Sequence, residues 1–219
     1  MKNDAKLYGE KISIPPTILF SLIGNHQDVR KAVSSDFKVP GDRIYLCGQS
    51  HQELGASEIA YMLRDETQGQ SGIGGRVPEI DTTRNLAMYR ALTGAMQKEL
   101  VASAHDCSDG GLAVAISECC FGSDSGARID VSPIMSDCNQ IEPWGAMFGE
   151  SLGRILVSVK PENSEAFENS MTDHACYFLG VVEEGDTISV TNGDTTLIST
   201  SMSSLRKAWK ATLDGGGPQ

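Results

Sequence analysis

Hydrophobic residues recur along this chain with two different periods, which predicts strands in some segments and helices in others. Between Arg154 and Lys160, for example, Ile155, Val157 and Val159 fall on one face, which is the alternation of a strand. Glycine and proline bound several other segments of this kind. The predicted strands are 17–24, 41–48, 100–104, 126–131, 154–160, 176–182, 187–190 and 196–199.

Steps of three and four between apolar residues predict four main helices, and a loop over 53–58 passes into a shorter one. Asp81 or Thr82 is a suitable N-cap for the first, and the second, 112–121, is apolar on most sides and should be buried. Pro161 opens the third, since proline is favoured in a first helical turn. The expected apolar stripes are Leu86, Tyr89, Leu92, Met96 and Leu100 in the first helix, Phe167 and Met171 in the third, and Met202, Leu205 and Trp209 in the last.

Strands and helices alternate without a regular repeat or an internal linker. This pattern predicts a single α+β domain in which helices pack against a mixed sheet. The polar, glycine-rich segment 67–76 is expected to form a mobile surface loop, and the tail 213–219 is expected to be disordered.

The charge of the chain narrows the classes of function. Its 219 residues carry a formal net charge of −11, and the sequence pI is about 4.8. We therefore expect no nucleic-acid partner and no anionic membrane, because both require clustered lysine and arginine. A phosphate ligand remains compatible with an acidic chain, since backbone amides and a bound cation can hold it.

Targeting signals and cysteines point to the cytoplasm. No apolar run approaches the roughly 20 residues that span a bilayer, and the first residues lack the pattern of a secretion signal. The six cysteines form no C-x-x-C pair, and Cys119 and Cys120 are adjacent within a predicted helix. This spacing favours reduced, mostly buried thiols over zinc ligands or a disulfide framework.

The most informative segment runs from Ala104 to Leu112, AHDCSDGGL, where a predicted strand ends and a buried helix begins. Free amides at a helix start attract anions, Gly110 and Gly111 admit a ligand to the backbone, and Ser108 offers a hydroxyl donor. Asp106 and Asp109 would repel a bare phosphate, so a divalent cation such as Mg²⁺ must bridge them. A plain helix cap built from aspartate or serine is the more common origin of such a pattern.

Two further segments are weaker candidates. In 148–154, Glu150 could ligate a metal, Ser151 could donate to a ligand and Arg154 could hold a phosphate or carboxylate. The alternative is a turn with a surface ion pair. The glycine-containing loop 53–58 is weaker still, and His105 is interpreted as a hydrogen-bonded structural residue.

The run from Ala104 to Glu118 resembles the H-D-x-S-D-G-G-L-A-V-A-x-x-E signature of phosphoribosylformylglycinamidine synthases. Other stretches resemble that family in the same order, which extends the resemblance over nearly the whole chain. They are Lys11–Thr17, Asp28–Val33, Pro40–Leu46, Glu53–Glu58 and Ser204–Lys210. Met1–Asp4 resembles the end of an internal family stretch, so we expect Met1 to be an internal methionine of a longer protein.

The resemblance implies a domain organisation. Residues 1–10 would be a remnant of the preceding domain or linker, and 11–212 would be the family's last domain, of the aminoimidazole-ribonucleotide-synthetase type. The partners implied are the amino-terminal domains of the parent synthase and a glutaminase domain or subunit. The fragment alone should be inactive and should expose apolar surface, with a homodimer as one possible result.

The resemblance also implies a reaction. The family converts formylglycinamide ribonucleotide to the amidine, using ATP and ammonia from glutamine. Carried over by motif, Asp106 would ligate Mg²⁺, and Ser108, Asp109, Gly110 and Gly111 would contact ATP in a half of the enzyme that holds an auxiliary nucleotide. No catalytic residue is assignable in this chain.

One departure from the family pattern concerns Glu150. The family often shows S-E-S-x-x-R, whereas this chain has Gly149 before Glu150, which leaves that glutamate doubtful as a metal ligand. Two alternatives stay open, namely a structural module without a working ligand site and another ATP-dependent enzyme of the same superfamily.

Overall fold

The computed structural model describes residues 4–13, 19–26, 28–64, 75–138 and 140–211. Its contacts divide the chain into two units, 1–32 and 33–219. The strands are β1 (Asp4–Leu7), β2 (Glu10–Ser13), β3 (Arg43–Cys47), β4 (Ser103–Asp106), β5 (Gly126–Asp130), β6 (Ile155–Val159), β7 (Cys176–Glu183), β8 (Thr187–Asn192) and β9 (Thr195–Ser201). The α-helices are α1 (Glu58–Met62), α2 (Thr82–Gln97), α3 (Gly111–Ser123), α4 (Ser132–Asp137), α5 (Pro143–Phe148), α6 (Ser164–Ser170) and α7 (Met202–Ala211), and the short 3₁₀ helices are η1 (Val29–Lys31) and η3 (Pro161–Asn163).

A seven-stranded mixed sheet forms the centre of the second unit. Its strand order is β4-β6-β3-β7-β5-β8-β9, and within it only β5 and β8 pair in parallel. Antiparallel and parallel pairs thus occur in one sheet, with helices packed on it, as the sequence pattern predicts.

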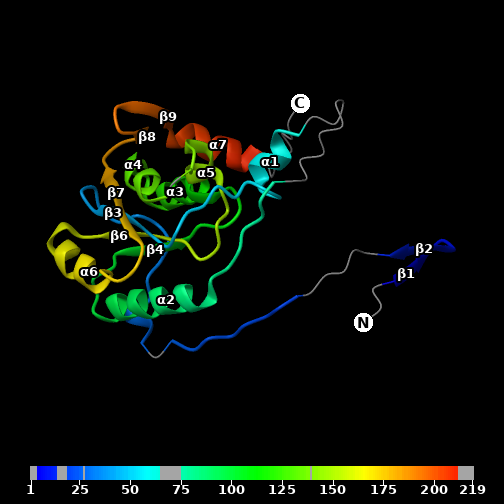
Figure 1. The fold of residues 1–219 in the computed structure, drawn as a ribbon, viewed down its shortest axis with the longest axis horizontal. Helices are drawn as coiled ribbons and strands as arrows, with labels where there is room; N and C mark the ends of the chain where they lie inside the picture. Colours follow the sequence, from blue (N-terminus) through cyan, green and yellow to red (C-terminus); the bar gives the residue numbers. More distant parts are fainter. Residues whose placement is uncertain (1–3, 14–18, 27, 65–74, 139, 212–219) are drawn as a thin grey trace. The chain divides into compact units, whose positions relative to one another are not determined.

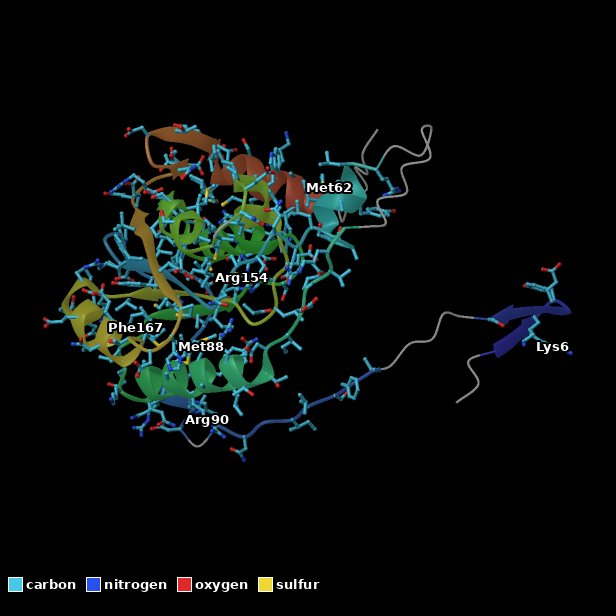
Figure 2. The ribbon with its side chains drawn as sticks, in the orientation of Figure 1. Lys6, Met62, Met88, Arg90, Arg154 and Phe167 are labelled. Atoms are coloured by element: carbon cyan, nitrogen blue, oxygen red, sulfur yellow. The ribbon has the colours of Figure 1, made fainter. Side chains whose placement is uncertain are left out.

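Helices cover both faces of this sheet. Figure 1 shows α3, α4, α5 and α7 on one side and α2 and α6 on the other. The alternation along β3 explains the two layers, because Ile44 and Leu46 enter the larger core with α3, whereas Tyr45 and Cys47 enter the smaller core with α2 and α6. Figure 2 shows Met88 of α2 and Phe167 of α6 within that smaller layer.

The first unit contains an antiparallel hairpin of β1 and β2. Its turn at Tyr8 and Gly9 has positive φ at both residues, as a tight hairpin turn requires. The strand predicted over 17–24 is wrong for its described part, since 19–24 has no regular structure and Leu19, Phe20, Leu22 and Ile23 are exposed. A run of apolar residues forms a strand only where a neighbouring strand pairs with it and a core buries its side chains.

Two other predictions need correction in detail. The strand expected over 100–104 is instead β4, because pairing with β6 places Ser103 opposite Ser158 and Asp106 opposite Ile155. On α2 the buried residues are Met88, Leu92 and Ala95, while Leu86 is half exposed. Steps of three and four fit more than one stripe of a helix, so the neighbouring α6 and sheet decide which stripe is buried.

The remaining predicted elements are present, and β1, β2, α4 and α5 were not predicted. The proposed domain limits of 11 and 212 stay a prediction, because the compact unit begins at residue 33 and the tail lies outside the described residues. The loop prediction for 67–76 falls almost wholly outside them as well. In the described part of the chain, no helix is long and apolar enough to cross a membrane.

Candidate functional site

The candidate site is a turn between an edge strand and a buried helix. β4 ends at Asp106, and the amide of Cys107 continues the ladder by donating to the carbonyl of Arg154 at 3.0 Å. Gly110 then adopts a left-handed conformation with φ of 76°, and α3 begins at Gly111. The positive φ explains why glycine stands at 110.

A cavity of about 360 Å³ opens beside this turn. Asp106, Ser108 and Asp109 border it, and all three are exposed. The other lining residues come from α2, the segment before it, the turn itself, the loop preceding β6 and the first residue of β6: Pro78, Tyr89, Cys107, Glu150, Leu152, Gly153, Arg154 and Ile155. The predicted residues at 106, 108 and 109 therefore do lie together at an open cavity.

The side chains of the turn do not cap the helix. The N-cap position is Gly110, which has no side-chain cap bond, and Ser108 donates its hydroxyl to the carboxylate of Asp106. This hydrogen bond lowers the pKa of Asp106 below its usual value, because it favours the charged carboxylate. The common alternative, a cap made by aspartate or serine, is therefore not the local arrangement.

Gly110 and Gly111 are buried and do not border the cavity. A β-carbon at Gly111 would press on the backbone carbonyls of Met147 and Gly149, and one at Gly110 would press on Val114. Close packing around the start of α3 therefore explains both glycines without a ligand, and their contact with a nucleotide stays a prediction.

Glu150 provides a negative charge at the start of α3, whose first turn contains no acidic residue. One carboxylate oxygen, Oε1, accepts from the amides of Gly110 and Glu58, each at 2.9 Å. It therefore serves the first amides of both α3 and α1, which the positive end of each helix favours. Sequence reasoning missed this role, because Glu150 lies far from both helices in the sequence.

Arg154 and Ser151 are structural residues. The guanidinium of Arg154 is 1% exposed and donates to the carbonyls of Ser151, Ala146 and Gly149 and to the hydroxyl of Ser50. Figure 2 shows Arg154 in the interior of the unit. The suggestion that it holds a phosphate is wrong for this conformation, because its donors are directed at the protein backbone.

Burial lowers the pKa of Arg154, since desolvation disfavours its charged form. The Ser151 hydroxyl, also 1% exposed, accepts from the amide of His51 at 3.0 Å. Both residues therefore fix the conformation of the loop before β6. Glu150 lies in this loop and is held in position with it.

His105 and Tyr89 complete the surroundings. His105 Nε2 lies 3.1 Å from Glu118 and Nδ1 lies 2.6 Å from the carbonyl of Asp106, which fits the expected structural role. Tyr89 borders the cavity, and burial, followed by the charge of Asp106, raises the pKa of its hydroxyl. The sequence placed Tyr89 on the buried stripe of α2, so its position beside the cavity was missed.

The loop 53–58 leads into α1. Ser57 is the N-cap of this helix, and its hydroxyl accepts a hydrogen bond from the amide of Ala60 at 3.3 Å. Glu53 in this loop is buried, 3.8 Å from Arg76, and one of its carboxylate oxygens has no hydrogen-bond partner among the described residues. All six cysteines are free thiols, and four of them are buried, which agrees with the prediction of mostly buried thiols.

The sequence matches the model of one protein family over a range that includes the candidate turn. The model of the AIR synthase related protein, C-terminal domain, matches residues 39–192. This range covers well over half of the chain and includes all of β3 to β8. The chain therefore belongs to the family of AIR synthase related C-terminal domains.

Solved structures show the same fold. Phosphoribosylformylglycinamidine synthase II from Thermotoga maritima superposes with a TM-score of 0.66 at 18% identity, over 80% of this chain and 27% of that one. T. maritima PurL complexed with FGAR superposes with a TM-score of 0.68 at 18% identity, over 81% of this chain and 30% of that one. The Escherichia coli hydrogenase maturation protein HypE superposes with a TM-score of 0.54 at 13% identity, over 78% of this chain and 51% of that one. The chain thus spans less than a third of the length of the two synthase structures.

Proposed function

We propose that this chain is the carboxy-terminal, nucleotide-contacting part of a phosphoribosylformylglycinamidine synthase. One observation carries this proposal, namely the cavity at the start of α3 that Asp106, Ser108 and Asp109 border without capping the helix. Side chains that served only as caps would turn inward onto the helix amides. Polar groups exposed to a cavity at a helix start are instead available to a phosphate-bearing ligand.

Solved structures of the same fold are known with adenine nucleotides bound. T. maritima PurL has been solved in complex with ATP, with ADP and with AMPPCP. Its likeness to this chain is a likeness of fold, so the assignment of ATP to the Asp106 turn rests on the turn's own chemistry.

The residues present fit Mg²⁺ when it arrives with a phosphate ligand. Among the described residues, no group of three or more acidic, histidine or cysteine side chains is arranged to hold a metal ion. Mg²⁺ commonly uses only one or two carboxylates and completes its shell with phosphate oxygens and water. Asp106 and Asp109 would be those carboxylates, while Glu150 is a poor ligand because its Oε1 already accepts two amides.

Electrostatics at the cavity also favour a cation. Asp106, Asp109 and Glu150 line it, and Arg154, whose guanidinium faces backbone carbonyls, is the only basic residue among the described residues of the lining. Negative phosphate oxygens would be repelled unless Mg²⁺ lay between them and the carboxylates. The magnesium ion would neutralise that charge, and the Ser108 hydroxyl, which donates to Asp106 in this structure, would turn to donate to a phosphate oxygen.

The proposed reaction belongs to the complete enzyme of purine biosynthesis. There, ATP would phosphorylate the amide oxygen of formylglycinamide ribonucleotide, and ammonia from glutamine would displace the phosphate. Amino-terminal synthase domains and a glutaminase would be the partners, and the cytoplasm the location. The relatives are known in assemblies named PurLQS and HypE-HypF, which is consistent with a multi-part enzyme.

A structural module is the second candidate. The amide of Gly110 is already satisfied by Glu150, and buried Arg154 fixes the neighbouring loop without a ligand. A turn stabilised in this way can hold its shape without a nucleotide. Ligand binding therefore distinguishes the two functions.

The test uses isothermal titration calorimetry of the purified chain with ATP and Mg²⁺, and with AMP as the matched ligand that lacks the outer phosphates. We expect saturable ATP binding, weaker AMP binding, and no product when formylglycinamide ribonucleotide and ammonia are added. Absence of any ATP binding would favour the structural module. Product formation would show that the chain is a complete catalyst and contradict the proposal.

A further inference from the structure

Cys47 and Cys176 face each other across two neighbouring strands. Cys47 ends β3, Cys176 begins β7, and the antiparallel register places them directly opposite. Their sulfur atoms lie 3.7 Å apart and share a hydrogen bond. In the sheet, β6 lies between this pair and β4, because Ile155 of β6 is opposite both Cys47 and Asp106.

The backbone around this pair suits a disulfide. The amide of Gly48 donates to the carbonyl of Ala175 at 2.9 Å, so the next pair along the ladder is the hydrogen-bonded one. Cys47 and Cys176 therefore form a pair without mutual backbone bonds, in which the Cα atoms are about 4.5 Å apart. Disulfides accept Cα separations from about 4.4 Å upward, so closure needs mainly a side-chain movement that brings the sulfurs to about 2.05 Å.

The two thiols differ in access. Cys47 is fully buried, whereas Cys176 is half-buried and borders a cavity of about 350 Å³ together with Met171, Thr172 and His174. The hydrogen bond to Cys176, and then burial, raise the pKa of the Cys47 thiol. A small oxidant can therefore reach Cys176 through the cavity, while Cys47 is held behind it.

We propose that Cys47 and Cys176 form an oxidation-sensitive pair that a hydroperoxide converts to a cross-strand disulfide. The Cys176 sulfur attacks a peroxide oxygen, the O–O bond breaks, and a sulfenic acid and water form. The Cys47 sulfur then attacks the sulfenic sulfur, the S–O bond breaks, and the departing hydroxide takes the Cys47 proton as a second water. In total, two thiols and one hydrogen peroxide give one disulfide and two waters.

In the test, the 219-residue chain is treated with hydrogen peroxide, the remaining thiols are blocked with iodoacetamide, and tryptic peptides are examined by mass spectrometry. We expect the peptide containing Cys47 to be linked to the one containing Cys176, and dithiothreitol to reverse the link. Cys138 is the matched thiol, since it is also half-buried but has no sulfur hydrogen-bonded to it. It should be oxidised about tenfold less than Cys176 at the same peroxide dose.

Single variants separate the two steps. Cys176→Ser should leave Cys47 reduced, whereas Cys47→Ser should stop at a Cys176 sulfenic acid that dimedone traps. Cys138→Ser should leave the link unchanged, and circular dichroism checks that each variant is folded. The proposal is overturned if peroxide leaves both wild-type thiols free, if Cys176 passes to sulfinic acid while Cys47 stays free, or if either thiol links to another cysteine.

Discussion

The carboxylate of Glu150 accepts a hydrogen bond from the amide of Gly110 at 2.9 Å, which closes the amino end of α3 from a distant loop. The same oxygen accepts from the amide of Glu58, so one side chain serves two helix starts. The charged side chain is thus a structural partner of the candidate site, and its loss should affect folding.

We expect Glu150→Ala to lower the free energy of unfolding by about 1–2 kcal/mol, because two amides lose a charged acceptor at positive helix ends. Glu150→Gln keeps an acceptor oxygen and should cost less. Urea denaturation measures both. Glu142, which is exposed and makes no side-chain cap bond at α5, provides the control, and Glu142→Ala should stay within about 0.5 kcal/mol of the parent. Equal effects at the two positions would refute the bridging role.

Gly149 explains how this chain departs from the pattern of the family it resembles. A β-carbon there would press on the carbonyl of Gly145 and approach the carbonyls of His51 and Glu53. Glycine at 149 therefore lets the loop pack closely, and Glu150 follows it directly.

We expect Gly149→Ala to destabilise the fold by about 1–3 kcal/mol through overpacking. The matched control is Gly94→Ala in α2, where a β-carbon would meet open space. That change should raise stability by about 0.5–1 kcal/mol, since alanine is the better helix former. Thermal unfolding of the two variants should therefore move in opposite directions, and a stabilising Gly149→Ala would contradict the packing account.

Ser108 should control the titration of Asp106. Its hydrogen bond holds the pKa of Asp106 below the usual 3.8, so any stability gained from the carboxylate is present above that pH and is lost as pH falls through the lowered value. Ser108→Ala should raise the pKa of Asp106 towards 3.8. Carbon NMR of the side-chain carboxyl measures the shift, with Asp130 on β5 as an internal reference that should not change. If the pKa of Asp106 does not change in Ser108→Ala, the hydrogen bond between Ser108 and Asp106 does not persist in solution.

The sequence predicted most elements of the sheet because Ile155, Val157 and Val159 share one face of β6 and because glycine bounds β3 and β5. It missed what depends on long-range packing. The register of β4 is set by β6, the buried stripe of α2 by its neighbours, and α4 and α5 are too short to give a clear period.

At the site, the local motif correctly grouped Asp106, Ser108 and Asp109, because neighbours in sequence share one turn. No local signal could place Glu150 against Gly110 or turn Arg154 inward, since both contacts depend on how the loop before β6 packs against α3 and the sheet. The sequence also could not show that Gly110 and Gly111 allow close packing at the start of α3, and their contact with a ligand stays a prediction.

We propose that Asp106 binds the Mg²⁺ that accompanies ATP at this turn. The most direct measurement is calorimetric titration of ATP, with and without Mg²⁺, into the wild-type chain, Asp106→Asn and the control Asp173→Asn, whose residue is exposed and away from the cavity. We predict that Mg²⁺ tightens ATP binding about tenfold or more in the wild type and in Asp173→Asn, and that Asp106→Asn loses this dependence because a neutral amide is a poor Mg²⁺ ligand. Equal Mg²⁺-dependent binding by all three proteins would contradict the assignment of Asp106.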